Sequence, residues 1–333
     1  MAALALTPAA APAAGAGVHK AVAGSTHLST NGSAFGSAFG SAKRYRLVDL
    51  GTLGGRISYA TAMNDRGAVV GSSSLAGDYI FHGFLWRNGK MTDLGSFRPT
   101  DINNKGQIVG TRDDANNAYL WRAGKLTDLG TLGGAFSYPT AINDRGQIVG
   151  MSDTADSRYA SFLWSKGRMR ELPLNSVADI NNRGQVAGGR VHGTDGYHAS
   201  VWYRGKVTDL GAGPFDRSNT YGINARGWVI GWTYSADQRE RGTLWRKRIA
   251  TDVGTLGGAF THLVAINDRG QILAVSHATD GSERPALWRH GVLTDLTKRG
   301  VGANGDFADL NNTGQIAATI RPELGSSHAV VYR

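Results

Sequence analysis

The sequence predicts an all-β protein, a single seven-bladed β-propeller with four strands per blade, from three observations. A unit of about 41 residues recurs seven times, a period that is typical of repeat architectures. Each copy holds four short apolar segments separated by turn residues, which is the strand content of one propeller blade. The two ends of the chain carry complementary parts of a copy, which indicates that the ring closes on itself.

A turn built on Asn and Gly marks each copy. Its Asn falls at Asn64, Asn103, Asn143, Asn181, Asn224, Asn267 and Asn311. In the clearest copy, apolar segments flank the turn Asn143 to Gly146, and such a turn favours a hairpin because Gly adopts positive φ without steric cost. A polar loop of variable length follows. It leads to an apolar strand that ends in Trp86, Trp121, Trp164, Trp202, Trp245 or Trp288, then to a second turn and the fourth strand.

The closure prediction comes from the chain ends. The seventh copy stops at Arg333, where its fourth strand should begin, whereas Tyr45 to Gly51 is a strand of the fourth type with no blade before it. We expect this N-terminal strand to complete the last blade, so that no sheet edge stays exposed.

The N-terminal segment differs from the repeats. Residues 1–17 are rich in Ala and other small residues and resemble the end of a secretory signal, and a Gly/Ser linker follows, so residues 1–42 are predicted to be signal-like and disordered and 43–333 to form the propeller. A secreted location is expected, with a plain Ala-rich tail as the alternative. No apolar run reaches the roughly 20 residues of a membrane-spanning helix, and the absence of Cys excludes disulfides and thiolate metal sites.

Short motifs inside the copies resemble those of the HAF repeat family of secreted bacterial proteins. The name-giving segment is carried by His82-Gly83-Phe84-Leu85-Trp86, His198-Ala199 and His328-Ala329, while copies two, three, five and six lack its His. The resemblance covers about residues 45 to 333 and implies a propeller in an extracellular location, without implying a reaction. The three His residues share one repeat position, so we interpret them as structural.

Propeller topology assigns residues to two faces. The Asn-Gly turns and the turns after the Trp residues should lie on one face, called the bottom face, and the variable loops on the other, called the top face. The bottom turns carry eighteen basic and three acidic residues, whereas the variable top loops have an acidic excess. The basic residues are Arg66, Lys105, Arg145, Arg183, Arg226, Arg269, Arg87, Lys90, Arg122, Lys125, Lys166, Arg168, Arg204, Lys206, Arg246, Lys247, Arg248 and Arg289. This bottom face either attaches to a polyanion through its summed field or is an ordinary solvated surface.

A ligand site is predicted at the top mouth of the channel. The residue five before each turn Asn is polar in all seven copies, and a concavity with a few convergent polar groups is the default ligand site. These residues are Tyr59, Arg98, Tyr138, Ser176, Asn219, His262 and Asp306. The top loops add Tyr197, Trp232, Tyr234 and His277 as candidate ligand-binding residues. The alternative is that strand ends at a solvated mouth are polar in any case.

Two classes of function remain open, and the sequence leaves uncertain whether the protein is an enzyme. The first is a binding or scaffolding module for an extracellular glycan or anionic polymer. The second is a carbohydrate-active enzyme, a polysaccharide lyase or glycoside hydrolase on an acidic polysaccharide, in which Arg241 would neutralise a carboxylate and His192 or His262 would move protons. A protein interaction platform is a third possibility. The chain is expected to be a monomer without cofactor or metal, and nucleic acid is disfavoured because no aromatic platform accompanies the bottom charges.

Overall fold

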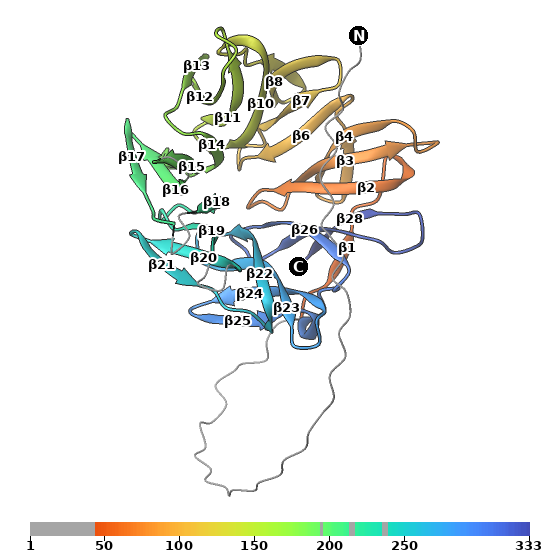
Figure 1. Cartoon of the computed structure of the whole chain (residues 1–333). Helices are drawn as coiled ribbons and strands as arrows, with labels where there is room; N and C mark the ends of the chain where they lie inside the picture. The colour runs from red at the N-terminus through yellow and green to blue at the C-terminus, as the bar shows by residue number, and fades with distance from the viewer. Residues whose placement is uncertain (1–43, 194–195, 213–216, 235–238) are drawn as a thin grey trace, which may run out of the picture. The chain divides into compact units, whose positions relative to one another are not determined.

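The chain folds into seven four-stranded antiparallel sheets arranged around a common centre (Figure 1). The structure, a computed structural model, describes residues 44–193, 196–212, 217–234 and 239–333, so the predicted N-terminal segment 1–42 lies outside the described residues. The sheets are numbered here as blades 1 to 7 in chain order. The fold class predicted from the repeats, a seven-bladed propeller with four strands per blade, is confirmed.

The first four blades each use four consecutive strands. Blade 1 contains β2 (Gly54–Met63), β3 (Val69–Leu75), β4 (Phe81–Arg87) and β5 (Lys90–Asp93). Blade 2 contains β6 (Phe97–Ile102), β7 (Ile108–Arg112), β8 (Ala115–Arg122) and β9 (Lys125–Asp128). Blade 3 contains β10 (Gly133–Ile142), β11 (Ile148–Thr154), β12 (Tyr159–Ser165) and β13 (Arg168–Glu171). Blade 4 contains β14 (Ser176–Ile180), β15 (Val186–His192), β16 (Gly196–Tyr203) and β17 (Lys206–Asp209).

The remaining blades repeat this order until the last one, which combines both ends of the chain. Blade 5 contains β18 (Ser218–Ile223), β19 (Val229–Tyr234), β20 (Glu240–Arg246) and β21 (Ile249–Asp252). Blade 6 contains β22 (Gly257–Ile266), β23 (Ile272–Ala278), β24 (Glu283–Arg289) and β25 (Val292–Asp295), and a 3₁₀ turn, η2 (Thr297–Arg299), follows it. Blade 7 contains β26 (Gly305–Leu310), β27 (Ile316–Ile320), β28 (His328–Tyr332) and β1 (Leu47–Asp49). Within the described ranges, no helix is long and apolar enough to cross a bilayer.

The hydrophobic core lies between adjacent blades. Between blades 2 and 3, for example, Val109 and Leu120 pack with Ile148 and Phe162, and none of these side chains is more than 9% exposed. The second and third strands therefore bury one face against the preceding blade and the other against the following blade, which explains why apolar residues run almost continuously through them. Burial of this apolar surface is the main force that holds neighbouring blades together.

The inner strand of every blade contains a β-bulge three residues before the turn Asn, for example at Thr140 in β10 and at Tyr221 in β18. A bulge leaves one residue outside the ladder and changes which face the following side chains occupy. The alternation of side chains between the two faces of the inner strand is therefore interrupted just before the Asn turn.

The N-terminal strand closes the ring, as the chain ends predict. Strand β1 pairs with β28 in antiparallel register, with Val48 opposite Val331. The Leu50 amide donates to the Ala329 carbonyl at 3.0 Å, and the buried Leu50 side chain joins a core cluster with Trp86 and Val331. Because β1 precedes blade 1 in the chain, its pairing joins the two ends of the chain in one sheet.

Deletion of residues 44–51 should lower the melting temperature by many degrees, because the seventh blade then loses its outer strand and the β28 edge is exposed. Thermal unfolding followed by circular dichroism measures the effect. Leu47→Ala is the matched control, since Leu47 lies in the same strand but is 41% exposed, and it should change stability by no more than about 0.5 kcal/mol. A deletion variant that melts at the wild-type temperature would contradict this closure.

Candidate functional site

The seven polar residues predicted at the top mouth occupy equivalent places in their inner strands, yet their side chains mostly contact partners within their own blades. The ring of Tyr59 stacks on Phe81 with centroids 6.2 Å apart, and Tyr138 lies 6.2 Å from Tyr159. Arg98 forms an ion pair with Asp113 of blade 2. These three residues are directed along their blades.

The next residues in this set behave similarly. The Tyr197 hydroxyl donates to Ser176 at 2.6 Å, so these two predicted residues meet within blade 4. The Asn219 side-chain oxygen accepts the Thr220 amide at 2.8 Å. Asp306 pairs with Arg321 at 2.9 Å. The seven side chains therefore do not all turn toward one point, and their role as ligand-binding residues stays a prediction.

Two of the seven, His262 and Asp306, line the same cavity. It has a volume of about 1140 Å³ and lies over blades 5 to 7 on the top face. Its wall combines aromatic rings with carboxylates, namely Tyr221, Phe260 and Phe307 with Glu240, Glu283 and Asp306. His262 lies 4.9 Å from the Tyr221 ring, and Arg239 contributes a guanidinium group. Carboxylates thus outnumber guanidinium groups in this wall.

Sequence reasoning missed Tyr221, Phe260, Glu240 and Glu283. Tyr221 occupies the bulge position of β18, between Thr220 and Gly222, where an alternating pattern does not predict the direction of a side chain. Phe260 was within reach of sequence reasoning, because it lies two residues before His262 in the same strand and alternation places both on one side.

Tyr221 keeps its proton at neutral pH. Burial raises the pKa of Tyr221 well above its usual range, and the charge of Glu240 together with the hydrogen bond from the phenol to that carboxylate raises it further. The phenol is therefore a hydrogen-bond donor and not a general base. Of the predicted catalytic residues, His262 lines this cavity.

The structure separates the other predicted catalytic residues. His192 lines a different cavity, of about 420 Å³, on blade 4, together with His198 and Asp209. Arg241 lies opposite Thr233 in the register of β19 and β20 in blade 5, and it is not in the wall of the larger cavity. The combination of Arg241 with His192 therefore does not form one site.

The remaining aromatic and His candidates lie beside the larger cavity. His277 packs on Phe260 with centroids 3.8 Å apart, and its Nε2 is 3.2 Å from a Glu283 oxygen. Trp232 and Tyr234 meet edge to face at 5.4 Å in β19. Neither ring is in the wall of the larger cavity, although the charge of Tyr234 raises the pKa of Tyr221, after burial and Glu240.

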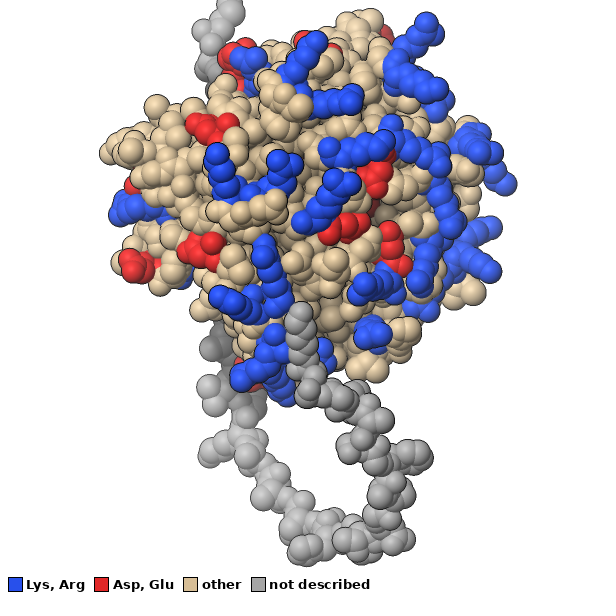
Figure 2. Space-filling view, turned by 180° about the vertical axis from the view of Figure 1, so that it is seen from behind, with Lys and Arg blue, Asp and Glu red and all other residues tan. Residues whose placement is uncertain are grey.

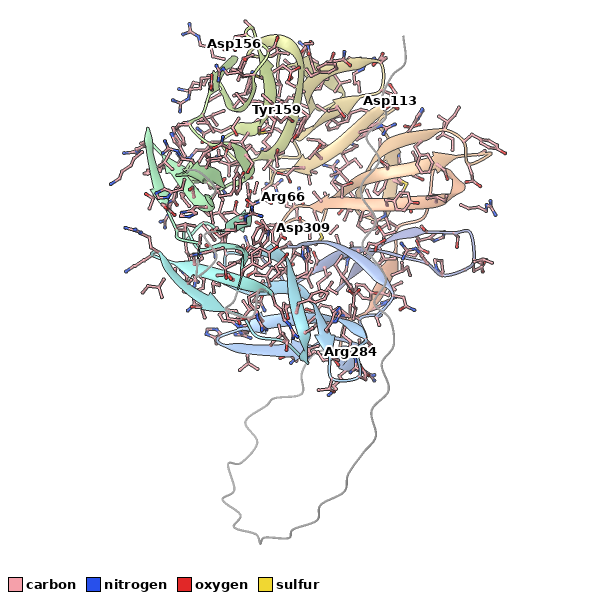
Figure 3. The ribbon with its side chains drawn as sticks, in the orientation of Figure 1. Arg66, Asp113, Asp156, Tyr159, Arg284 and Asp309 are labelled. Carbon is pink, nitrogen blue, oxygen red and sulfur yellow. The ribbon has the colours of Figure 1, made fainter. Side chains whose placement is uncertain are left out.

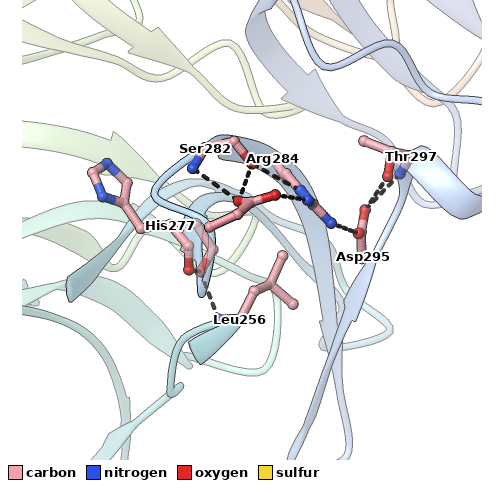
Figure 4. Close-up of polar contacts among 8 residues, drawn as sticks. Leu256, His277, Ser282, Arg284, Asp295 and Thr297 are labelled. Atoms are coloured by element: carbon pink, nitrogen blue, oxygen red, sulfur yellow. Dashed lines mark hydrogen bonds and ion pairs between the residues drawn. The ribbon is translucent and has the colours of Figure 1, made fainter. Parts of the chain in front are cut away.

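Six arginines of the top face form ion pairs with acidic residues. Figure 4 shows Arg284 between two carboxylates: it pairs with Asp280 on one side and with Asp295 at 3.1 Å on the other, and Asp295 also accepts the Thr297 amide. Arg56, Arg112, Arg158 and Arg321 each pair with an acidic residue as well. In each of these pairs a carboxylate compensates the guanidinium charge locally.

The bottom face is different. All eighteen basic residues of its turns are present in the described part of the chain, and none of them forms an ion pair with any described acidic residue. Seventeen are exposed, and Arg246 is half-buried over the Trp228 ring. Figure 2 shows a face of the molecule on which Lys and Arg side chains far outnumber acidic ones. The fifteen-charge excess of this face is thus uncompensated by neighbouring side chains.

One of these cations occupies an unfavourable backbone position. The turns after the Trp strands have two residues with positive φ, and the second is Gly at 89, 124, 167, 205 and 291. In blade 5 the second residue is Arg248, with φ 71°. A non-Gly residue in this region costs on the order of 1 kcal/mol. Blade 5 therefore has an additional cation at a position where the other turns have Gly.

The floor of the channel is a closed ring of hydrogen bonds. Each turn Asn accepts amides of its own turn through Oδ1, as Asn143 does from Arg145 and Gln147. Its Nδ2 donates to the carbonyl of the next turn Asn, at 2.9 to 3.2 Å in all seven blades, and Asn311 donates back to Asn64. These residues are structural and leave few groups free for a ligand.

Three carboxyls, Asp101, Asp179 and Asp309, lie in the channel above this floor. Each accepts the amide of the following residue and the equivalent amide of the next blade, as Asp101 does from Ile102 and Ile142. Figure 3 shows Asp309 near the centre of the ring. These three residues are not among the ligand-binding residues predicted from the sequence.

Burial makes the charged form of these carboxyls unfavourable. The side chains are partly accessible from the channel, but surrounding protein raises the pKa of Asp101 to about 7 against the effect of the two amides, and the charges of Asp179 and Asp309 raise it further. The pKa values of Asp179 and Asp309 rise to about 6, again mainly through burial.

Comparisons with known proteins identify the fold. The chain matches the β-propeller domain of the Trilobed protease from Pyrococcus furiosus (TM-score 0.56, 10% identity, 83% of this chain and 95% of that chain). It also matches virginiamycin B lyase from Staphylococcus aureus (TM-score 0.56, 10% identity, 87% and 99%) and YCF48 bound to D1 peptide (TM-score 0.54, 10% identity, 88% and 95%). At such low identity the likeness shows the fold alone. No protein-family model and no curated protein matches the chain, so the HAF resemblance stays a prediction.

The raised pKa values predict that the protein becomes less stable as pH rises from about 4 to about 7. An unfolded Asp titrates near 3.9, so in this window the folded state binds more protons than the unfolded state, and the free energy of unfolding falls with pH. Asp101→Asn should flatten this decline. Urea unfolding at pH 5, 6 and 7 measures it.

Asp78→Asn is the matched control for the pH experiment. Hydrogen bonds from the Arg56 amide and side chain lower the pKa of Asp78 to about 2, so Asp78 titrates below the tested range. The control should keep the wild-type slope between pH 5 and 7. An Asp101→Asn variant with an equally steep decline would show that Asp101 is already ionised at pH 5.

Proposed function

We propose that the protein is a binding module for an acidic polysaccharide, which it binds through the bottom face. The observation that carries this proposal is the set of eighteen basic residues without an ion-paired partner among the described residues, beside only three acidic residues in the same turns. The top-face arginines named above are paired with acids, so the contrast does not follow from basic composition alone. Summed fields of this kind attract polyanions and raise their local concentration.

The geometry of this face favours a flexible polysaccharide over a nucleic acid. Aromatic rings near the face are covered by guanidinium groups: Arg226 and Arg246 lie 5.3 and 4.2 Å from the Trp228 ring, and Arg204 lies 5.2 Å from the Tyr203 ring. Binding of single-stranded nucleic acid depends on open aromatic rings on which bases stack. The strained Arg248 supports selection for charge, because Gly would fit that turn at lower energy.

Loss of three bottom charges should weaken binding to polygalacturonate, whereas loss of three top charges should not. The test variant combines Lys90→Gln, Lys125→Gln and Lys206→Gln. The matched control combines Arg98→Gln, Arg112→Gln and Arg321→Gln, which lowers the net charge equally. We expect the test variant to bind several-fold more weakly, measured by calorimetry at 50 mM salt.

Salt provides an independent check of the same proposal. Raising salt from 50 to 200 mM should weaken wild-type binding by at least on the order of tenfold, since exposed charges are screened. Equal weakening in both triple variants would indicate a nonspecific effect of net charge. Preference for single-stranded DNA over the uronate polymer would replace the polysaccharide with a nucleic acid.

A second candidate function is recognition of a neutral or amino sugar in the cavity over blades 5 to 7. Its aromatic rings can stack on sugar faces, and Glu240, Glu283 and Asp306 can accept hydrogen bonds from hydroxyl or ammonium groups. The carboxylate excess disfavours a uronate at this position. A lyase reaction would need a cation on the substrate carboxylate and a group that accepts a proton. In this wall Arg239 and His262 have the side-chain chemistry for these two roles.

Phe260→Ala should weaken sugar binding on a glycan array and in calorimetry by at least about tenfold, because a stacking surface is lost. Tyr138→Ala is the matched control, as Tyr138 is similarly exposed (44% against 39%) but lies outside this cavity. Binding lost only with Tyr138→Ala would place the ligand at the opposite side of the mouth. Release of unsaturated uronate that disappears in His262→Ala would instead identify a lyase.

A further inference from the structure

Blade 4 brings two His residues and one Asp together at the outer part of the sheet. His198 Nδ1 lies 2.8 Å from Asp209 Oδ2, and His192 Nε2 lies 3.9 Å from the same oxygen. The two imidazole rings stack with centroids 4.6 Å apart and an interplanar angle of 13°. One potential ligand atom from each of the three residues lies within 4.8 Å of the other two.

The His-Asp pair of blade 4 recurs in two other blades. The same His-Asp pair joins the third and fourth strands in blade 1, His82 with Asp93 at 2.9 Å, and in blade 7, His328 with Asp49 at 2.6 Å. The pair by itself is therefore part of the repeat.

His192 is particular to blade 4. In the strand register, Arg190 is opposite His198, Ser73 opposite His82 and Ile320 opposite His328. Two residues further along, blade 4 has His192, whereas blade 1 has Leu75 and blade 7 has Pro322. Neither of these can bind a metal, so only blade 4 among these three has a third ligand.

The surroundings suit a site that is open on one side. The side chains range from 9% exposed at His198 through 36% at Asp209 to 65% at His192. They line the cavity of about 420 Å³, to which Ser200 contributes a hydroxyl and Arg190 a guanidinium group. The Gly211 amide donates to Asp209 Oδ1 at 2.7 Å and so directs Oδ2 toward the imidazoles, the kind of outer-shell contact that orients metal ligands.

We propose that His192, His198 and Asp209 bind a divalent transition metal of the zinc class, with a fourth position open to water. Two imidazoles and one carboxylate are ligands that Zn²⁺ prefers, and bonds of about 2.0–2.2 Å in a tetrahedron place ligand atoms roughly 3.3–3.5 Å apart. The separations of 2.8 and 3.9 Å lie on either side of this value, and the ligand atoms of the two His residues lie within 4.8 Å of each other, so metal binding requires rotation of the stacked imidazoles. The proposal is independent of the polysaccharide and sugar proposals.

Zinc titration of the untagged full chain, freed of metal with a chelator, tests the site. Competition with a chromophoric chelator should give one tight Zn²⁺ per chain. His192→Ala should reduce its affinity by more than the roughly 10–100-fold expected for an outer-shell residue. Because His192 is exposed, this variant should fold, and its melting curve without metal verifies that. Cobalt in place of zinc should give tetrahedral absorption bands that His192→Ala removes.

The two other His-Asp pairs are internal controls. His82→Ala and His328→Ala each remove a His from an equivalent pair that lacks a third ligand, and both variants should keep the tight site. Absence of tight binding in wild type would overturn the proposal. It would equally be overturned if His192→Ala kept the affinity, or if His82→Ala lost as much affinity as His192→Ala.

Discussion

Seven asparagines connect the seven blades at the floor of the channel, because the side-chain amide of each one donates to the backbone carbonyl of the next. Each Asn satisfies amides of its own turn and donates to the carbonyl of the next, at 2.9 to 3.2 Å throughout. Its contacts lie within a buried environment, where an unpaired polar group costs on the order of 1–3 kcal/mol. The turn sequence is therefore constrained by two demands at once, closing a hairpin and linking it to its neighbour.

The residues that follow the seven turn asparagines form a second ring, in which Asp and Asn alternate except at one position. Around the ring, Asp65, Asn104, Asp144 and Asn182 alternate, and the amide of Asn104 lies between the carboxylates of Asp65 and Asp144. Seven positions cannot alternate strictly, because one pair of like residues would have to meet. Ala225 occupies the position between Asn182 and Asp268, so no such pair forms. The odd blade number thus explains the one apolar residue in this ring.

With its floor and blade interfaces occupied by structural contacts, the propeller can vary its chemistry at loops, bulges and strand ends. Tyr221 at a bulge helps to form the cavity over blades 5 to 7, Arg248 adds a cation at a strained turn, and His192 joins a His-Asp pair that two other blades use only as a scaffold. Each of these residues departs from the repeat at a position where the ring does not depend on it. Departures from an internal repeat are therefore the most informative guide to function in this chain.

The sequence by itself determined the blade number, the four strands per blade, the closing role of Tyr45 to Gly51 and the two faces, because the repeat period and turn residues act through local backbone geometry. It also located His262 and Asp306, which share a cavity, but it grouped them with Tyr59 and Tyr138, which contact their own blades. Only the tertiary structure decided which side chains meet. Bulges reverse the direction of the side chains that follow them, and ion pairs join residues that lie on different strands or loops. It alone showed that top arginines such as Arg98, Arg284 and Arg321 have acidic partners, while the bottom cations have none among the described residues. Pairing depends on distances in space, which separation along a chain does not specify.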